Sequence, residues 1–338
     1  MTKKERIKAA LSGGEVDRIP INLWMHFSAE DQDIRQLAKR QVEFTKSYDF
    51  DFIKLMPFGL YSVLDYGAKI TFFNQTGKPP EVAEGAIHHA KEWGTLTPLD
   101  ASAGAYGKQV ELARLAVRGA GSEFPVIQTI FSPLTTARKL AGDRILQDLV
   151  EEPTLFKQAL EAITQTTINF VKKNIEAGVD GFFFATQCAD SDFLSESLYA
   201  EFGEYYDRKV IDSYKDAVWF NVVHIHGNHP YFERLAKYPV PCINWHDRWV
   251  SPSLAEARKI TGKCLLGGIR EAPYYDENHK KIRESLLLTG TEAELQTHLR
   301  EAVESAGRSG LILGPGCVAP PETTEKNIRI VRQAVESF

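Results

Sequence analysis

The sequence predicts an α/β protein of the (β/α)8, or TIM, barrel class. Eight short apolar runs recur along the 338 residues, and longer patterns typical of amphipathic helices separate them. Most of the runs are continuously apolar, as is typical of parallel strands buried on both faces. Strand–helix alternation repeated eight times indicates a barrel. A doubly wound open sheet is the alternative, but the glycine-rich phosphate turn that would favour it is absent after the first strand.

The eight predicted strands follow one another along the whole chain. They are residues 18–27 (RIPINLWMHF), 50–57 (FDFIKLMP), 124–131 (FPVIQTIF), 180–186 (DGFFFAT), 217–226 (AVWFNVVHIH), 241–246 (PCINWH), 263–269 (KCLLGGI) and 310–316 (GLILGPG). Two of the intervening helices have clear boundary signals. One is expected over 153–178, with Gly178 as its C-terminal cap. Another is expected over 291–307, where Thr291 and Glu294 match a capping box.

The segment 58–123 between the second and third predicted strands is longer than one crossover helix requires. Its central part has the composition of small strands and turns. We therefore interpret 58–123 as an insertion over the barrel mouth, serving as a lid or as a partner surface. Residues 1–338 otherwise form a single predicted domain.

Composition places the chain among ordinary globular proteins. Hydrophobic residues make up 43%, charged residues 25%, and the net charge is −5. No basic cluster of the density typical of nucleic-acid binding occurs. The N-terminus lacks the apolar core of a signal peptide, and the longest apolar runs are far shorter than a membrane span. We expect a cytoplasmic protein that binds neither nucleic acid nor membranes.

In a barrel of this class the active site lies at the C-terminal ends of the strands, so the candidate residues are the polar and aromatic side chains found there. The expected substrate-binding residues are Trp24, His26, Lys54, Gln128, Asn244 and Arg270, and the expected catalytic residues are Gln187, His246 and Arg248. In the stretch WHDR, His246 is interpreted as an acid–base group or substrate contact, and Arg248 as an anion contact. The alternative for this stretch is a solvated loop in which Asp247 pairs with Arg248.

Three residues form a candidate metal site. His224 and His226 are two apart on a strand, so both side chains point to the same face. Cys317 follows a Gly-Pro-Gly turn at the end of the last strand and could reach the same ion. Two imidazoles and one thiolate leave one position open, which is typical of catalytic zinc. The alternative is a group of packed or hydrogen-bonded side chains without a metal.

The remaining histidines and cysteines have plainer interpretations. Cys242 and Cys264 lie inside strands and are expected in the core, whereas Cys188 fits either the core or the mouth. His229 falls past a turn and is not an expected ligand. Surface positions are expected for His88, His89, His279 and His298.

Stretches spread over nearly the whole chain match one known family. They are TKKERIKAALSGGEVDRIP, FSPLTTARKLAG, AGVDGFFFATQ, LSESLYAEFGEYYDRKVID, NWHDR, LLGGI and LILGPGCVAPPETTEKNI. In their order and spacing the chain resembles the uroporphyrinogen decarboxylase superfamily, which also includes zinc- and corrinoid-linked methyltransferases. The decarboxylases of that superfamily carry an arginine-rich segment after the first strand, where this chain has NLWMHFSAEDQD and no arginine before Arg35.

The resemblance is greater to the methyltransferase branch. Those enzymes have a His-x-Cys-Gly segment after strand five and a cysteine after strand eight. The matching residues here are His224, His226 with Gly227, and Cys317, so a histidine replaces one cysteine. The resemblance implies a zinc-dependent methyltransferase that moves a methyl group between a small substrate and a corrinoid carried by a partner protein. With one thiolate instead of two, the zinc site would carry a net charge of about +1 and would favour an oxygen or nitrogen leaving group.

Two other functions remain open at this point. One is a cofactor-independent decarboxylase of the porphyrinogen type, which would need cationic groups around the mouth. The other is a non-enzymatic subunit that binds a corrinoid or another small molecule. The sequence leaves open whether the chain forms a homodimer.

Overall fold

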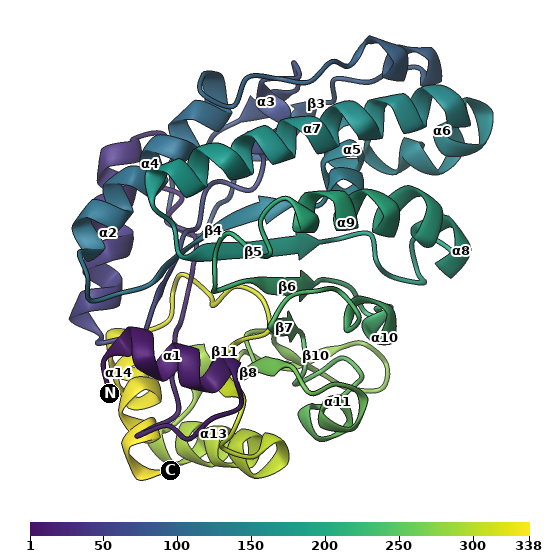
Figure 1. Cartoon of the computed structure of the whole chain (residues 1–338). Helices are drawn as coiled ribbons and strands as arrows, with labels where there is room; N and C mark the ends of the chain where they lie inside the picture. The colour runs from purple at the N-terminus through teal and green to yellow at the C-terminus, as the bar shows by residue number, and fades with distance from the viewer.

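Seven parallel strands form one curved sheet at the centre of the protein, as the computed structural model of residues 1–338 shows (Figure 1). The order in the sheet is β1-β4-β5-β6-β7-β8-β11. The strands are β1 (Ile53–Lys54), β4 (Val126–Phe131), β5 (Gly181–Thr186), β6 (Val222–Ile225), β7 (Cys242–Trp245), β8 (Cys264–Ile269) and β11 (Leu311–Pro315). Two antiparallel pairs lie outside this sheet: β2 (Lys69–Thr71) with β3 (Glu81–Glu84), and β9 (Tyr274–Tyr275) with β10 (Lys281–Arg283).

The predicted strand over 18–27 is reduced to a single bridge. Ile21 pairs in parallel with Leu313 of β11, and its carbonyl accepts a hydrogen bond of 3.0 Å from the amide of Asp51, just before β1. Pro20 offers no N–H, which limits the ladder that this segment can form. The short segment nevertheless lies between the two edge strands of the sheet, because Ile21 contacts Asp51, just before β1, on one side and β11 on the other.

Helices surround the outer side of the sheet (Figure 1). They are α1 (Lys3–Leu11), α2 (Ile34–Ser47), α3 (Tyr61–Leu64), α4 (Gly104–Ala120), α5 (Pro133–Ala141), α6 (Ile145–Glu151), α7 (Pro153–Ala177), α8 (Glu196–Tyr199), α9 (Tyr205–Asp212), α10 (Phe232–Leu235), α11 (Leu254–Ile260), α12 (Leu286–Thr289), α13 (Glu292–Ala306) and α14 (Glu325–Ala334). Shorter turns are η1 (Ala90–Thr95), η2 (Gly142–Arg144), the π-helical η3 (Ala200–Glu204) and η4 (Val335–Ser337). None of the helices combines the length and the apolar character that a membrane crossing requires.

Both helices with clear boundary signals are confirmed. Helix α7 ends at Ala177, and Gly178 follows in the left-handed conformation with φ of 95°. Helix α13 begins after Thr291, which forms the expected capping box with Glu294.

The interpretation of all of 58–123 as an insertion is not confirmed. Residues Gly104–Ala120 form α4, a regular helix that packs against α2 and α7 and leads into β4. A helix in this place is an ordinary crossover element rather than a collection of small strands and turns. The small elements expected from the sequence are confined to the part before α4, where the β2–β3 pair lies outside the central sheet.

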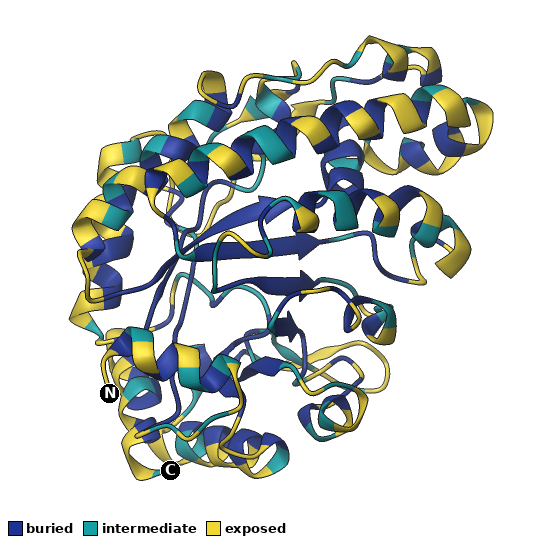
Figure 2. Ribbon diagram, viewed as in Figure 1, coloured by how far each residue is buried: buried dark blue, intermediate teal, exposed yellow.

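The two faces of the sheet pack into two cores, and its strands are buried throughout (Figure 2). The larger core holds 83 buried residues, including those of the surrounding helices. A smaller core of 13 residues contains the side chains that alternate with them along the strands, such as Phe183, Val222 and Ile312. Cys242 and Cys264 belong to this smaller core, which confirms their predicted burial, and Cys188 belongs to the larger one.

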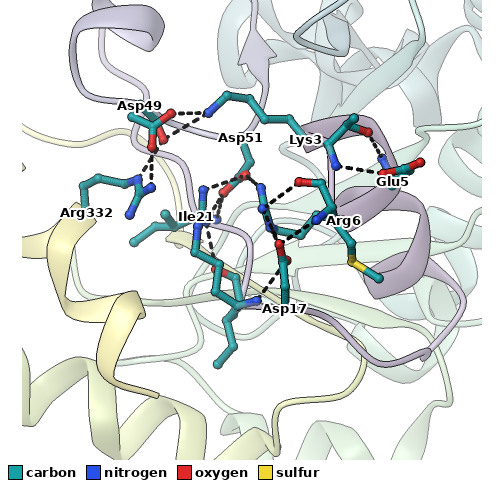
Figure 3. Close-up of polar contacts among 12 residues, drawn as sticks. Lys3, Glu5, Arg6, Asp17, Ile21, Asp49, Asp51 and Arg332 are labelled. Atoms are coloured by element: carbon teal, nitrogen blue, oxygen red, sulfur yellow. Dashed lines mark hydrogen bonds and ion pairs between the residues drawn. The ribbon is translucent and has the colours of Figure 1, made fainter.

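A network of charged side chains closes the end at which the strands begin (Figure 3). Asp51, just before β1, is fully buried. Its carboxylate accepts hydrogen bonds of 2.7 Å from Arg6, 2.7 Å from Arg18 and 2.8 Å from the amide of Ile21. Asp17 pairs with the other side of the Arg6 guanidinium at 2.7 Å. Helix α1 is thereby fixed across the end of the sheet opposite the candidate site.

Candidate metal centre and its cavity

Three potential metal ligands converge at the C-terminal ends of the strands. His224 lies in β6, and His226 follows the same strand. Cys317 follows β11, and strands β7 and β8 lie between β6 and β11 in the sheet. One ligand atom from each residue lies within 4.8 Å of the others. Nδ1 of His226 is 4.0 Å from Sγ of Cys317. That separation is shorter than a Zn–N bond of about 2.1 Å and a Zn–S bond of about 2.3 Å laid end to end, so one zinc ion could bind both atoms.

Cys317 reaches the histidines because the turn before it passes very close to β7. A Cβ atom built on Gly316 would lie 2.8 Å from both the Cα of His246 and the carbonyl of Trp245. Contacts that short do not occur in real structures, so only glycine allows this approach. The Gly-Pro-Gly turn therefore sets the position of the thiol.

Asn244 fixes the orientation of His224. Its carbonyl oxygen lies 2.6 Å from Nδ1 of His224. Both hydrogens of its amide are donated elsewhere, at 2.7 Å to the carbonyl of Leu266 and at 3.1 Å to that of Pro315. The oxygen must therefore accept a hydrogen bond from the N–H at Nδ1, which leaves the lone pair on Nε2 of His224 free for a metal. Asn244, expected at the substrate, is instead bonded to a candidate metal ligand.

His246 and Glu271 form a second layer beside the candidate ligands. Nε2 of His246 is 3.0 Å from Nδ1 of His226, and Nδ1 of His246 is 2.6 Å from Glu271. The same carboxylate accepts bonds of 3.1 Å from the indole of Trp249 and 3.1 Å from the amide of Gly316. Glu271 thus links His246 to the turn that carries Cys317. No role was predicted for Glu271, and the only signal in the sequence was its place just after the end of β8.

Burial controls the ionisation of the candidate ligands. It lowers the pKa of His226 to about 4, with a smaller contribution from His246, and it lowers the pKa of His224 well below the ordinary range. Burial also raises the pKa of the Cys317 thiol to about 12. At neutral pH both imidazoles are therefore uncharged and able to coordinate, whereas the thiol keeps its proton until a metal displaces it. The donor types, their spacing and the fixed tautomer of His224 all fit zinc.

A cavity of about 110 Å³ lies directly beside this cluster. Its wall brings together several of the residues predicted from the sequence, namely Trp24, His26, Lys54, Gln187, His224 and Cys317. The wall also contains Lys139 of α5, a residue that the sequence did not indicate. Lys139 donates a hydrogen bond of 2.7 Å to the carbonyl of Gly59, which is 80 residues away in the chain.

Gln128, Arg248 and Arg270 do not line this cavity. Gln128 is fully buried and donates to the carbonyl of Gln109 and to Asn174, both at 3.1 Å. The two arginines line a separate cleft of about 610 Å³ next to α13 and the β9–β10 pair. Arg248 donates to Glu301 there at 3.0 Å. The guanidinium of Arg270 is bonded to backbone carbonyls, including that of Pro273.

The expectation of a solvated His298 is wrong. This side chain is buried, and its Nε2 accepts a hydrogen bond of 3.0 Å from the amide of Arg270. The helical pattern of α13 could not reveal that the residues after β8 cover this face. His88, His89 and His279 are exposed as expected, and His229 is exposed and pairs with Asp192 at 2.8 Å.

Comparison with known proteins places the chain among relatives from two branches. Methylcobamide:CoM methyltransferase MtbA from Methanosarcina mazei is 21% identical over 241 residues, which are 67% of this chain and 70% of that protein. Uroporphyrinogen decarboxylase from Aquifex aeolicus is 24% identical over 298 residues, which are 81% of this chain and 84% of that protein.

Solved structures share the fold. A methyltransferase from Methanosarcina mazei superposes with a TM-score of 0.82 at 21% identity, covering 100% of this chain and 99% of that one. A B12-independent methionine synthase from Shewanella superposes with a TM-score of 0.54 at 13% identity, covering 95% and 92%. The family model described as Uroporphyrinogen decarboxylase (URO-D) matches residues 2–338. The resemblance expected from the sequence is thereby confirmed: the chain belongs to the uroporphyrinogen decarboxylase family.

Proposed function

We propose that the protein is a zinc-dependent methyltransferase that moves a methyl group between a small substrate and a corrinoid carried by a partner protein. The observation that carries the proposal is the cluster of His224, His226 and Cys317 beside a small cavity. The similarity to a methylcobamide:CoM methyltransferase supports the same function.

The size of the cavity supports a small substrate and an external corrinoid. Its volume is about 110 Å³, whereas pockets for drug-sized ligands measure roughly 300–1,000 Å³. A tetrapyrrole or a corrinoid ring does not fit inside such a space. The corrinoid would therefore be presented at the mouth by its carrier protein. The small volume also argues against the two alternative functions, a porphyrinogen decarboxylase and a subunit that binds a corrinoid.

In the proposed mechanism His224, His226 and Cys317 would hold the zinc ion. Bound there, zinc supplies Lewis-acid activation of the heteroatom that carries or receives the methyl group. Asn244 keeps the lone pair of His224 directed at the ion. With Nδ1 of His226 bound to the ion, Nε2 of His246 gives up its contact with that nitrogen and can hold or release a proton beside the site, while Glu271 holds the other ring nitrogen of His246.

The remaining residues of the cavity would orient the substrate and exclude water. Trp24, His26, Lys54 and Gln187 line it and serve this purpose in the proposal. The roles of Gln128, Asn244, Arg248 and Arg270 as substrate contacts, and of Arg248 in catalysis, stay predictions, as do the cytoplasmic location and a homodimer. We further propose that residues 1–338 form one domain in which 18–27 completes a (β/α)8 barrel and the segment between β1 and α4 shapes its mouth.

Metal analysis of the protein purified without chelators tests the proposal. We expect stoichiometric zinc, its loss in His226→Ala, and its retention in His88→Ala, which changes an exposed histidine that belongs to no group of candidate ligands. Protein without stoichiometric zinc, or a His226→Ala variant with full metal content, would lead us to abandon the proposal.

A further inference from the structure

Two lysines in the wall of the cavity have no negatively charged partner. The ammonium of Lys54 lies 3.0 Å from Oγ1 of Thr129 and 4.2 Å from the centre of the Phe183 ring. The ammonium of Lys139 donates to a backbone carbonyl and lies 3.3 Å from the centre of the Phe131 ring. The hydrogen-bond partners of both amines are uncharged, and no aspartate or glutamate lines the cavity.

Such an arrangement is costly unless a ligand completes it. Burying an ammonium group without a counter-ion loses its hydration, and neutral partners offset only part of that loss. Burial lowers the pKa of Lys54 and of Lys139 to about 7 each, which expresses this cost. An anion bound between the two amines would supply the missing charge.

Both lysines line the same cavity as His26. His26 lines the wall, and burial together with the charges of Lys54 and Lys139 lowers its pKa to about 4. Because Lys54 and Lys139 belong to the wall of one cavity, a single small ligand can lie near both. At neutral pH His26 is uncharged there and can donate or accept a hydrogen bond without opposing an anion.

We infer that this cavity binds the acidic group of the substrate between Lys54 and Lys139, with its other end directed at His224 and Cys317. The volume of about 110 Å³ equals the space of only a few water molecules at about 30 Å³ each, which fits an acid group on a short carbon chain. Lysine ammonium groups bind as point charges, so carboxylate, sulfonate and phosphate are all compatible. The substrate class is thus a small organic acid. Its alignment with the metal rests on the proposed function, whereas the binding of the anion does not.

Binding of short acids to the whole protein tests this inference. The probes are propionate, ethanesulfonate and methyl phosphate, with propionamide and propylammonium as neutral and cationic counterparts of similar size. Calorimetric or ligand-detected NMR titrations would use both zinc-loaded and chelator-treated protein. We expect at least one acid to bind roughly tenfold more tightly than propionamide, and propylammonium not to bind. The acid with the highest affinity identifies the preferred group.

Variants then assign the binding to the two amines. Lys54→Met and Lys139→Met should each reduce the preference for the acid over propionamide, and the double variant should abolish it. Lys209→Met is the matched control, because that partly exposed lysine pairs with Glu161 on the protein surface. Either single variant serves as the test if the double variant does not fold.

The inference is overturned if no acid binds the wild-type protein, if propionamide binds equally well, or if the variants keep the preference. Failure of this inference is separable from failure of the proposed function. Protein that binds acids but no zinc would contradict only the methyltransferase proposal. Protein that binds zinc but shows no preference for acids would contradict only the acid-binding site.

Discussion

The two ends of the central sheet treat buried charge in opposite ways. At the end where the strands begin, the carboxylate of Asp51 accepts bonds from Arg6, Arg18 and a backbone amide (Figure 3). At the end where the strands finish, the ammonium groups of Lys54 and Lys139 have only neutral partners. The difference lies in whether the protein itself completes the charge pairs.

This difference separates stability from function. A buried charge whose partners all come from the chain is satisfied by folding and strengthens the closed end. A buried or partly buried charge without a partner weakens the fold, and such charges are typical of functional sites, where a ligand can complete them. The predictions below test this contrast, from the largest expected effect to the smallest.

Replacing Asp51 with alanine should have the largest effect on stability. Arg6 and Arg18 would keep their charges in a buried site without this carboxylate, which typically costs about 3–5 kcal/mol in the free energy of unfolding. Urea unfolding measures the change. The folded fraction should retain its zinc, and a loss of zinc affinity comparable with the loss of stability would contradict the separation of the two ends.

Replacing Asn244 with leucine should weaken metal binding about 10–100-fold, because His224 loses the group that orients it. Competition with a chelator of known zinc affinity gives the measurement. Gln128→Leu is the matched control, since it removes a buried strand amide bonded to Gln109 and Asn174, away from the metal cluster. That control should lose stability by about 1–3 kcal/mol and keep its zinc affinity; equal losses of zinc affinity would remove the special role of Asn244.

Replacing both Lys54 and Lys139 with methionine should raise the free energy of unfolding at about pH 6 by something on the order of 1 kcal/mol or more. Burial lowers the pKa of each lysine to about 7 in the folded protein, whereas an unfolded lysine titrates at about 10.4. Between these values the unfolded chain binds more protons, so wild-type stability rises with pH. The titratable neighbours are His26, His224 and Cys317 for Lys54, and His26, His226 and Cys188 for Lys139.

The advantage of this double variant should therefore shrink as the pH rises from about 7 to about 10. Unfolding curves over that range, in buffers without acids of the tested kind, give the comparison. If the difference in the free energy of unfolding between the variant and wild type stays constant with pH, the pKa values of the two lysines are not lowered in the folded protein.

Replacing Asp49 with asparagine should have the smallest effect. Asp49 also pairs with Lys3 and Arg332 at the closed end, but its side chain is 60% exposed. Exposed pairs contribute about 0–1 kcal/mol. A loss as large as that of Asp51→Ala in the same urea assay would mean that the number of ion pairs, rather than their burial, stabilises this end.

The parts of the molecule that sequence predicts well depend on local patterns. Continuous apolar runs located the strands, and the spacing of His224 and His226 placed both rings near one point. Lys139 and Glu271 could not be identified in this way. Their partners Gly59 and Gly316 lie 80 and 45 residues away in the chain, so only the folded arrangement brings them to the site.

The direction in which a side chain points at the end of a strand is equally hard to predict from sequence. His246 and Arg248 are neighbours in the stretch WHDR, yet the first lies beside the metal cluster and the second lines the separate cleft near α13. The length of the segment before α4 suggested an insertion, but periodicity did not show where the crossover helix begins. In each case the missing information is which other element covers the residue.

The ligand shell of the bound metal tests the central claim most directly. X-ray absorption of the zinc-loaded protein should show one sulfur at about 2.3 Å and nitrogen or oxygen atoms at about 2.1 Å, with imidazole scattering from two histidines. Cys317→Ala should remove the sulfur contribution. A zinc shell without sulfur, or one that keeps its sulfur in Cys317→Ala, would contradict the assignment of His224, His226 and Cys317 as the metal centre.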